Sequence, residues 1–354
     1  MAAPQLDEVN TGVTKRIMPG LVDNFFKNGP VMAYCKKNRM KPWTGGPQIQ
    51  ENFLYKPMKG GFYKKGAQFD ITKRQTKTGL LFEPAFAEVN VTEYTEDVEV
   101  IIRGPEAVFS QVNTDLGNAA MTLSAILEIA IWKHGQALPG DDRSGTINGF
   151  AEALSNGIDP SWDGNIFTAY GGQPRVDVRP ALDSPTGLIA ANVNGAITYH
   201  VLEHSYMSCV IGAEHPKLGV TTNRCQGFIN ENFQPQQRLQ MGDTVEPTIG
   251  WPGIKFKQAT IVVSQYAPGA DGVNDPDLGN YFAAGETFAW LNPGGEGEDA
   301  FFRLHTSTSP KYSFGFTGFK VAQDSTVVAG QILWSGAFTV RTPRLMRILF
   351  NITK

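Results

Sequence analysis

The longest amphipathic pattern in the chain lies between residues 105 and 134. Pro105 occupies the first helical position with Glu106 beside it, and Lys133, His134 and Gly135 indicate the end of a helix. Between these signals, apolar residues recur in steps of three and four, which is typical of a helix that buries one stripe: Val108, Phe109, Val112, Leu116, Ala119, Leu123, Ile126, Leu127, Ala130 and Ile131. About 30 residues at 1.5 Å each predict a helix roughly 45 Å long, which is unusual in a compact domain.

The pattern on either side of this helix favours strands. Apolar and polar residues alternate from Glu88 to Arg103, which predicts a strand with one wet face. Shorter helices are expected near residues 147–155, 197–211 and 222–233, with a short strand at 218–220 before the last. Further strands are expected at 255–266, 281–291, 301–304, 312–321 and 327–340. This succession predicts an α+β protein whose mixed sheet is flanked by helices.

Residues 46–88 show a different pattern. Glycine and proline interrupt any helix there, while Phe62, Phe69 with Ile71, and Leu81 are spaced like short strands. We therefore expect a long hairpin with little core of its own. Because an isolated two-stranded hairpin is at best marginally stable in water, this one needs a surface to lie on.

Composition supports a globular protein rich in loops and strands. The chain has 354 residues, of which 41% are hydrophobic and only 18% charged, with 38 Gly and 22 Pro. These values disfavour disorder and coiled coil. Its three cysteines form no CxxC pair and leave at least one thiol unpaired, which indicates a reducing compartment. The start of the chain lacks the plan of a signal peptide and no stretch is apolar enough to span a membrane, so we expect a soluble cytosolic product.

The net charge of −3 hides an uneven distribution. Residues 1–82 carry 14 basic and five acidic side chains, a local net of +9, and the remainder therefore carries −12. Directly after the basic part comes a run without a basic residue until Arg103: Glu83, Glu88, Glu93, Glu96, Asp97 and Glu99. Either the charges cluster by sign on the wet faces of one domain, or a basic segment lies on an acidic surface or on nucleic acid.

One short motif suggests chemistry. His200, Glu203 and His204 fit H-x-x-E-H, in which two histidines on one helix face hold zinc and the glutamate acts as general base. A third ligand would have to come from Glu214, His215 or a distant carboxylate. The alternative is that these polar residues simply line the wet face of an amphipathic helix. Phosphate-binding loops and nucleophile elbows are absent from the sequence, so we assign no catalytic residue, no metal and no cofactor.

The order of these elements resembles the major capsid (coat) proteins of tailed bacteriophages, which have the Hong Kong 97-type fold. Short local matches accompany the order: Thr198-Tyr199, Val220-Thr221-Thr222, Gln236-Gln237-Arg238, Trp334-Ser335-Gly336 and Pro343-Arg344-Leu345-Met346. The order of elements carries more weight than any of these matches.

The resemblance implies a division of the chain. Residues 1–45 would form an N-terminal arm, 46–88 an extended β-hairpin loop, and 89–145 a peripheral domain whose spine helix is 105–134. Residues 146–266 would form an axial domain with a mixed sheet flanked by helices. The β-rich segment 267–354 would return to the peripheral and axial domains.

The resemblance also implies a structural function without enzyme activity. Subunits would assemble into pentamers and hexamers of an icosahedral head that encloses double-stranded DNA, in the host cytoplasm and away from membranes. Because the arm begins within a few residues of Met1, a separate scaffolding protein is expected; a portal and a decoration protein are further partners. An encapsulin-type nanocompartment shell shares the fold, and an enclosed enzyme cargo would identify it.

Candidate contact residues follow from the charge distribution. In the resemblance, basic residues of the loop would meet an acidic surface of another subunit, formed by Glu93, Glu96, Asp97 and Glu99. The loop residues are Lys56, Lys59, Lys64, Lys65, Lys73, Arg74 and Lys77. Arm residues would contact a neighbour or packaged DNA: Lys15, Arg16, Lys36, Lys37, Arg39 and Lys41. Each exposed pair contributes only about 0–1 kcal/mol, so steering and register are the expected gains.

Overall fold

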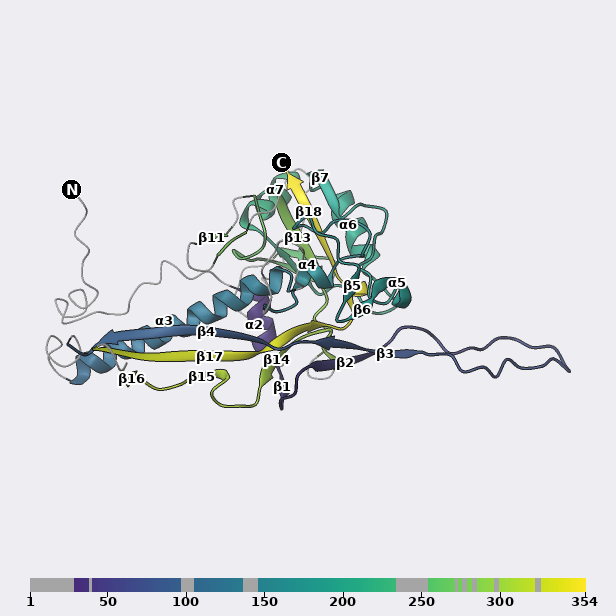
Figure 1. Ribbon diagram of the computed structural model, residues 1–354. Coiled ribbons are helices and arrows are strands. Elements are labelled where there is room, and N and C mark those ends of the chain that lie inside the picture. Colours follow the sequence, from purple (N-terminus) through teal and green to yellow (C-terminus); the bar gives the residue numbers. More distant parts are fainter. Residues whose placement is uncertain are drawn as a thin grey trace.

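The computed structural model describes most of the chain. The described residues are 29–37, 40–96, 105–135, 146–233, 254–270, 273–275, 279–281, 285–295, 299–321 and 326–354, with side chains of the long helix from residue 113 onward. Within them lie two six-stranded sheets, a long helix beside the first sheet, and a hairpin that projects far beyond the rest of the molecule (Figure 1).

The first sheet is built around one long strand, β17 (Val327–Val340). The first ten residues of β17 pair antiparallel with β4 (Ala85–Tyr94), from Val327 opposite Tyr94 to Gly336 opposite Ala85. Its C-terminal end pairs with β14 (Phe302–Ser307), which in turn pairs parallel with β1 (Met40–Trp43). The short strands β15 (Ser313–Phe316) and β16 (Lys320–Val321) complete this sheet against β17.

Helix α3 (Pro105–Trp132) runs along β4 and β17 and confirms the long amphipathic helix. It has 28 residues and ends two residues before the expected position. The Lys133 N–H donates to the Ala130 carbonyl three residues earlier, which is a tighter turn than that of an α-helix. His134 is buried instead of lying in the last helical turn, because its Nδ1 is 2.7 Å from Asp163 Oδ2.

Strand β4 confirms the alternating pattern but not its bounds. Ala85 and Val91 face the core, while Phe86, Glu88 and Tyr94 face outward. The strand begins three residues earlier than expected and ends at Tyr94. Residues 97–103, which were expected to continue it, lie outside the described residues.

The second sheet is mixed. Its order is β7 (Asn192–Ala196), β18 (Arg347–Thr353), β13 (Glu286–Leu291), β8 (Leu218–Thr221), β10 (Ala259–Val263) and β9 (Ile254–Phe256). The β8–β10 and β18–β7 pairs are parallel, and β13 runs antiparallel to both of its neighbours. The C-terminal part of the chain therefore supplies strands to both sheets.

Two helices contribute side chains to the core of the second sheet. Helix α6 (Tyr199–Ser208) is shorter than the expected 197–211 at both ends. It begins at Tyr199 because Thr198 caps it, accepting a hydrogen bond from the Val201 N–H. Helix α7 (Asn223–Phe233) begins after Thr222, whose Oγ1 accepts from the Cys225 N–H at 3.2 Å, as its sequence predicts. Leu202, Cys225, Ile229 and Trp290 share one buried cluster.

The remaining described elements are short. They are α2 (Pro30–Lys36), α4 (Phe150–Ala153), β5 (Ala169–Tyr170), β6 (Gln173–Pro174), α5 (Arg175–Val178), β11 (Val273–Asp275), β12 (Gly279–Tyr281) and the 3₁₀ turn η4 (Pro343–Leu345). Helix α4 spans four residues where 147–155 was expected to be helical.

Candidate inter-subunit surfaces

The projecting hairpin consists of β2 (Ile49–Leu54) and β3 (Lys77–Phe82), paired antiparallel from Ile49 opposite Phe82 to Leu54 opposite Lys77. Its root belongs to the body of the subunit, since Ile49, Leu80 and Phe82 are buried. The Leu81 N–H also donates to the Gly171 carbonyl at 2.9 Å. The hairpin then leaves the body (Figure 1).

Residues 55–76, which we name the projecting loop, pair with no described strand. One backbone hydrogen bond joins Tyr55 to Thr76 at their base, and another closes the tip from Ala67 N–H to the Lys64 carbonyl. Gly66 in that tip turn has φ +85°, a value that suits the third residue of a type II turn and favours glycine. The expectation of short strands at Phe62, Phe69 and Ile71 was wrong, because the two arms of the loop contact each other through side chains, such as Lys59 with Asp70, and not through a backbone ladder.

The projecting loop exposes large apolar side chains. Met58 is 80% exposed, Ile71 92% and Phe62 fully exposed, while Tyr63 and Phe69 contact each other edge to face with 4.9 Å between ring centroids. Soluble monomers rarely gather such residues on one exposed segment, whereas interfaces do. The spacing of Phe62, Phe69 and Ile71 had predicted strands, and Met58 and Tyr63 were not predicted. The signal that could have corrected this prediction is the placement of these residues among glycines and lysines, without alternation.

The loop is also basic. Seven basic side chains and one acidic side chain lie in residues 55–77. Six of the basic side chains are exposed: Lys59, Lys64, Lys65, Lys73, Arg74 and Lys77. Lys59 differs, since its Nζ is 2.6 Å from Asp70 Oδ2. Hydrogen bonds from Lys59 and then Thr72 lower the pKa of Asp70 to about 2. Lys56 lies over the ring of Tyr55.

The candidate acidic surface lies at the other end of the subunit. Glu88 is exposed on β4 and Glu93 is partly buried near its end. The hydroxyl of Thr326 lowers the pKa of Glu96, and Asp97 and Glu99 lie outside the described residues. Because β4 runs from the hairpin root toward the far end of β17, the projecting loop and this acidic end point in opposite directions (Figure 1). The two surfaces can meet only between subunits.

The candidate arm residues fall into two groups. Lys15, Arg16 and Arg39 lie outside the described residues. Residues 30–37 and 40–43, however, pack in the body: Val31 and Cys35 are fully buried, and Lys36 Nζ donates to Ser124 Oγ on α3 at 2.7 Å. Lys37 is exposed, and Lys41 is 3.6 Å from Glu51. Of the candidate arm residues that the structure describes, Lys36 and Lys41 therefore have partners within the subunit.

Glu51 anchors the root of the hairpin. It is 4% exposed, and its carboxylate lies 3.1 Å from His305 Nε2, 3.4 Å from Arg303 Nη1 and 3.4 Å from Arg341 Nε. Burial alone would raise its pKa, but the hydrogen bond from His305 and the charges of Lys41, His305 and Arg303 lower it to about 2. The cluster ties β2 to β14 and to the end of β17, so the base of the hairpin is held firmly.

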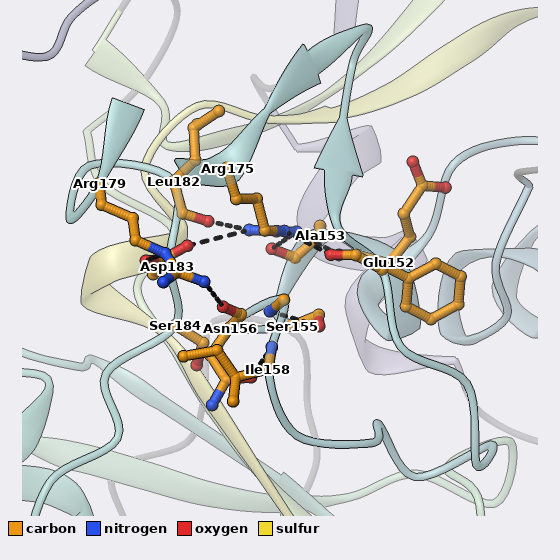
Figure 2. A network of polar contacts seen from close by, with 12 residues as sticks. Glu152, Ala153, Ser155, Asn156, Ile158, Arg175, Arg179, Leu182, Asp183 and Ser184 are labelled. Atoms are coloured by element: carbon orange, nitrogen blue, oxygen red, sulfur yellow. Dashed lines mark hydrogen bonds and ion pairs between the residues drawn. The ribbon is translucent and has the colours of Figure 1, made fainter. Parts of the chain in front are cut away.

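Arg175 organises the adjacent part of the body (Figure 2). Its fully buried guanidinium donates to the carbonyls of Phe167 at 3.0 Å, Glu152 at 2.6 Å and Ala153 at 3.3 Å, and also to that of Leu182. Two of these carbonyls are at the end of helix α4 and the other two are in irregular segments, so none of them has a sheet partner. One side chain therefore fixes the irregular segment 152–184.

The zinc hypothesis gains no support from the geometry. The rings of His200 and His204 are 4.2 Å apart, but Glu203 is engaged by Lys257 Nζ at 2.8 Å. Glu214 accepts from Asn292 instead of approaching the histidines. In the described part of the chain, no group of three or more His, Cys, Asp or Glu side chains could hold a metal ion.

The cysteines are core residues. Cys35, Cys209 and Cys225 are all buried, and burial raises the pKa of Cys209 and Cys225 to about 12. Such thiols are poor nucleophiles. None of the described helices is long and apolar enough to cross a membrane.

Comparison with solved structures identifies the architecture. No family model and no curated protein matches the sequence. The capsid of cyanophage A-1(L) nevertheless aligns with a TM-score of 0.63 at 12% identity, covering 96% of this chain and 97% of that one. The chain has the Hong Kong 97-type capsid fold. The α+β fold class that the sequence analysis expected is therefore confirmed.

Two further structures show how widely the fold extends. The capsid of a native GTA particle aligns with a TM-score of 0.54 at 10% identity, with 96% of both chains covered. The SrpI encapsulin from Synechococcus elongatus PCC 7942 aligns with a TM-score of 0.56 at 10% identity, covering 93% of this chain and 92% of that one. The fold is thus shared with a phage capsid and with an encapsulin shell.

Proposed function

We propose that this chain is the major capsid protein of a tailed bacteriophage, a structural subunit that assembles with copies of itself. The observation that carries the proposal is the projecting loop. It presents apolar and basic side chains that its own subunit leaves uncovered, within a fold shared over the whole chain with shell proteins. A loop of this kind is stable only when a neighbour covers it.

In the proposed shell, subunits form pentamers and hexamers of an icosahedral head. Three basic residues that follow the loop tip, Lys73, Arg74 and Lys77, meet the acidic end of β4 on a neighbour, which includes Glu93, Glu96 and the adjoining Asp97 and Glu99. Each exposed ion pair contributes only about 0–1 kcal/mol. Several pairs together set the register of assembly, and their individual weakness lets a wrongly placed subunit dissociate.

The shell would enclose double-stranded DNA in the virion after assembly in the host cytoplasm. Lys15, Arg16, Lys37 and Arg39 would supply non-specific phosphate contacts or contacts to a neighbour. A separate scaffolding protein, a portal and a decoration protein are the further partners that we propose. None of these roles requires a catalytic residue or a cofactor.

The second candidate function is an encapsulin-type shell, which the likeness to the SrpI encapsulin favours. The two candidates share the same subunit architecture and differ in what the shell contains. The two functions must therefore be distinguished by what the shell contains and not by its shape.

The test is electron microscopy of particles that carry this chain, recovered from its native source and treated with nuclease. Closed shells that protect double-stranded DNA support the capsid function. Shells that enclose a protein cargo and no DNA overturn it in favour of the encapsulin. A monomer that holds one zinc ion per chain would overturn both.

A further inference from the structure

A cavity of about 280 Å³ opens beside the segment that Arg175 organises. Residues 154–162, residues 184–191 and the start of β18 line it, and Pro160, Trp162, Ile189 and Phe350 supply apolar wall. Small-molecule sites usually measure about 300–1,000 Å³, so this cavity lies below that range. Its size suits one large side chain.

The margin of the cavity is apolar and exposed. Ile158 is 60% exposed and Leu188 is 84% exposed. Ile158 lies between Asn156 and Asp159 in the chain, and both of these line the cavity. Leu188 likewise lies between two lining residues, Gly187 and Ile189. An exposed apolar margin around a preformed hollow is typical of a surface that a protein partner covers.

The cavity is held open by hydrogen bonds on both sides. Asn156 Oδ1 accepts from the backbone N–H groups of Ile158 and Asp159 at 2.9 and 2.8 Å, and Arg179 Nη2 donates to the Asn156 carbonyl at 3.2 Å (Figure 2). On the opposite side, buried Arg347 donates to the Thr186 and Ile189 carbonyls. A partner would bind without having to order these loops first.

The same chain carries a side chain that suits this cavity. Phe62 on the projecting loop is fully exposed, and the Tyr63–Phe69 contact beside it leaves its ring uncovered. A phenylalanine ring is rigid and loses little conformational freedom on binding. Lys64 and Lys65 follow it, and Asp159 in the cavity wall has the opposite charge.

We propose that Phe62 of one copy inserts into this cavity on a second copy, with Lys64 and Lys65 facing Asp159. This inference rests on the proposed function and names the receiving surface of the loop. Every copy of the chain carries both the Phe62 ring and the cavity, on different parts of its surface, so the contact between two copies is head to tail. Such contacts close into rings when the rotation between subunits permits it.

Thiol crosslinking tests this contact directly. Gly61→Cys places a thiol beside Phe62 without altering the ring, and its new Cβ meets nothing within 4 Å. Leu188→Cys places the other thiol at the cavity margin. The native Cys35, Cys209 and Cys225 are buried, so background reaction is low. The two single variants are mixed, assembled and treated with a short bifunctional thiol reagent. A crosslinked dimer joining residues 61 and 188 is expected.

The matched control pairs Gly61→Cys with Val321→Cys, because Val321 is exposed on β16, away from the cavity-lining segments. If particles form but the 61–188 crosslink is no stronger than this control, the inference is wrong and the proposed function is unaffected. Absence of particles even from the unaltered chain would instead overturn the proposed function.

Substitution of the ring gives an independent measurement. Phe62→Ala is expected to raise the subunit concentration needed for assembly by at least about fivefold, as removal of an interface anchor does. Phe62→Leu should recover most of the loss, and Val321→Ala should change nothing. Equal assembly by Phe62→Ala and the unaltered chain contradicts the inference.

Discussion

The body of the subunit and its projecting loop contain the same kinds of residues, but the body buries them and the loop exposes them. In the body, charged side chains such as Glu51 and Arg175 are buried and each has several partners. In the loop, lysines and large apolar side chains are exposed together, and Phe62 has no cover at all. The body has a buried core of its own, whereas the loop, in the function that we propose, is half of an interface.

This difference shows that charge has two separate uses in one chain. Buried charges hold the irregular backbone and the hairpin root in one conformation, because a buried charge without a partner would raise the free energy of the folded subunit. Exposed charges on the loop contribute almost nothing to subunit stability but guide association. Substitutions in the two regions should therefore affect different measurements.

The largest effect on subunit stability is expected from Arg175→Met. It removes the donors that satisfy four backbone carbonyls and should lower the free energy of unfolding by about 3–5 kcal/mol. Urea denaturation of the unassembled subunit measures this. The control is Arg179→Met, which is more exposed and should cost less than about 1 kcal/mol. Equal losses in the two variants would show that Arg175 does not organise its segment.

The next effect is expected at the hairpin root. Glu51→Gln leaves Arg303 and His305 buried without their carboxylate and should cost about 2–3 kcal/mol at neutral pH. Because the pKa of Glu51 is lowered to about 2, its contribution is present above about pH 4.5 and is lost as pH falls toward 2. The stability gap between the two proteins should therefore close over that range. A gap that does not change with pH would contradict this electrostatic role.

A smaller effect of opposite sign is expected at Glu128. This fully buried carboxylate on α3 accepts the N–H groups of Val31 and Met32, with Lys36 and Trp132 nearby. Burial raises its pKa to about 7, so its contribution to stability is complete below about pH 4.5 and declines as pH rises through 7. Relative to Glu128→Gln, the unaltered protein should lose about 1–3 kcal/mol over that range. Thermal unfolding at pH 5 and pH 8 measures it, and parallel pH profiles would refute it.

The smallest effect on the subunit, and a large one on assembly, is expected from charge reversal in the loop. Changing Lys64, Lys65, Lys73 and Arg74 to glutamate should leave the melting temperature of the subunit unchanged while blocking particle formation. Circular dichroism and electron microscopy of the same preparation report the two outcomes. Normal shells from this variant would refute electrostatic docking of the loop.

The sequence predicted the elements that depend on local pattern. The end of helix α3 was predicted to within two residues, and the start of α7 was predicted near the threonines 221 and 222, of which Thr222 is the cap. The strand order could not be predicted, since β4 meets β17 more than 230 residues later in the chain and no local signal encodes that pairing. The overall fold was predicted from the order of the elements along the chain and not from any single motif.

The candidate site was predicted only in part. Basic residues of the loop were recognised because composition shows them. The partners of Glu51 and the cavity beside Arg175 could not be foreseen, since each depends on residues from distant segments. The loop strands were wrongly expected because apolar spacing was interpreted as burial within the same subunit, whereas Phe62 and Ile71 are exposed.

Hydrogen exchange of the projecting loop tests the central claim most directly. The amides of residues 56–75 are compared in the unassembled subunit and in assembled particles, with β17 as the internal reference. We expect the loop to exchange rapidly in the free subunit and to become protected in particles, while β17 is protected in both. A loop already protected in the free subunit, or still unprotected in particles, would contradict the conclusion that it is completed by a neighbour.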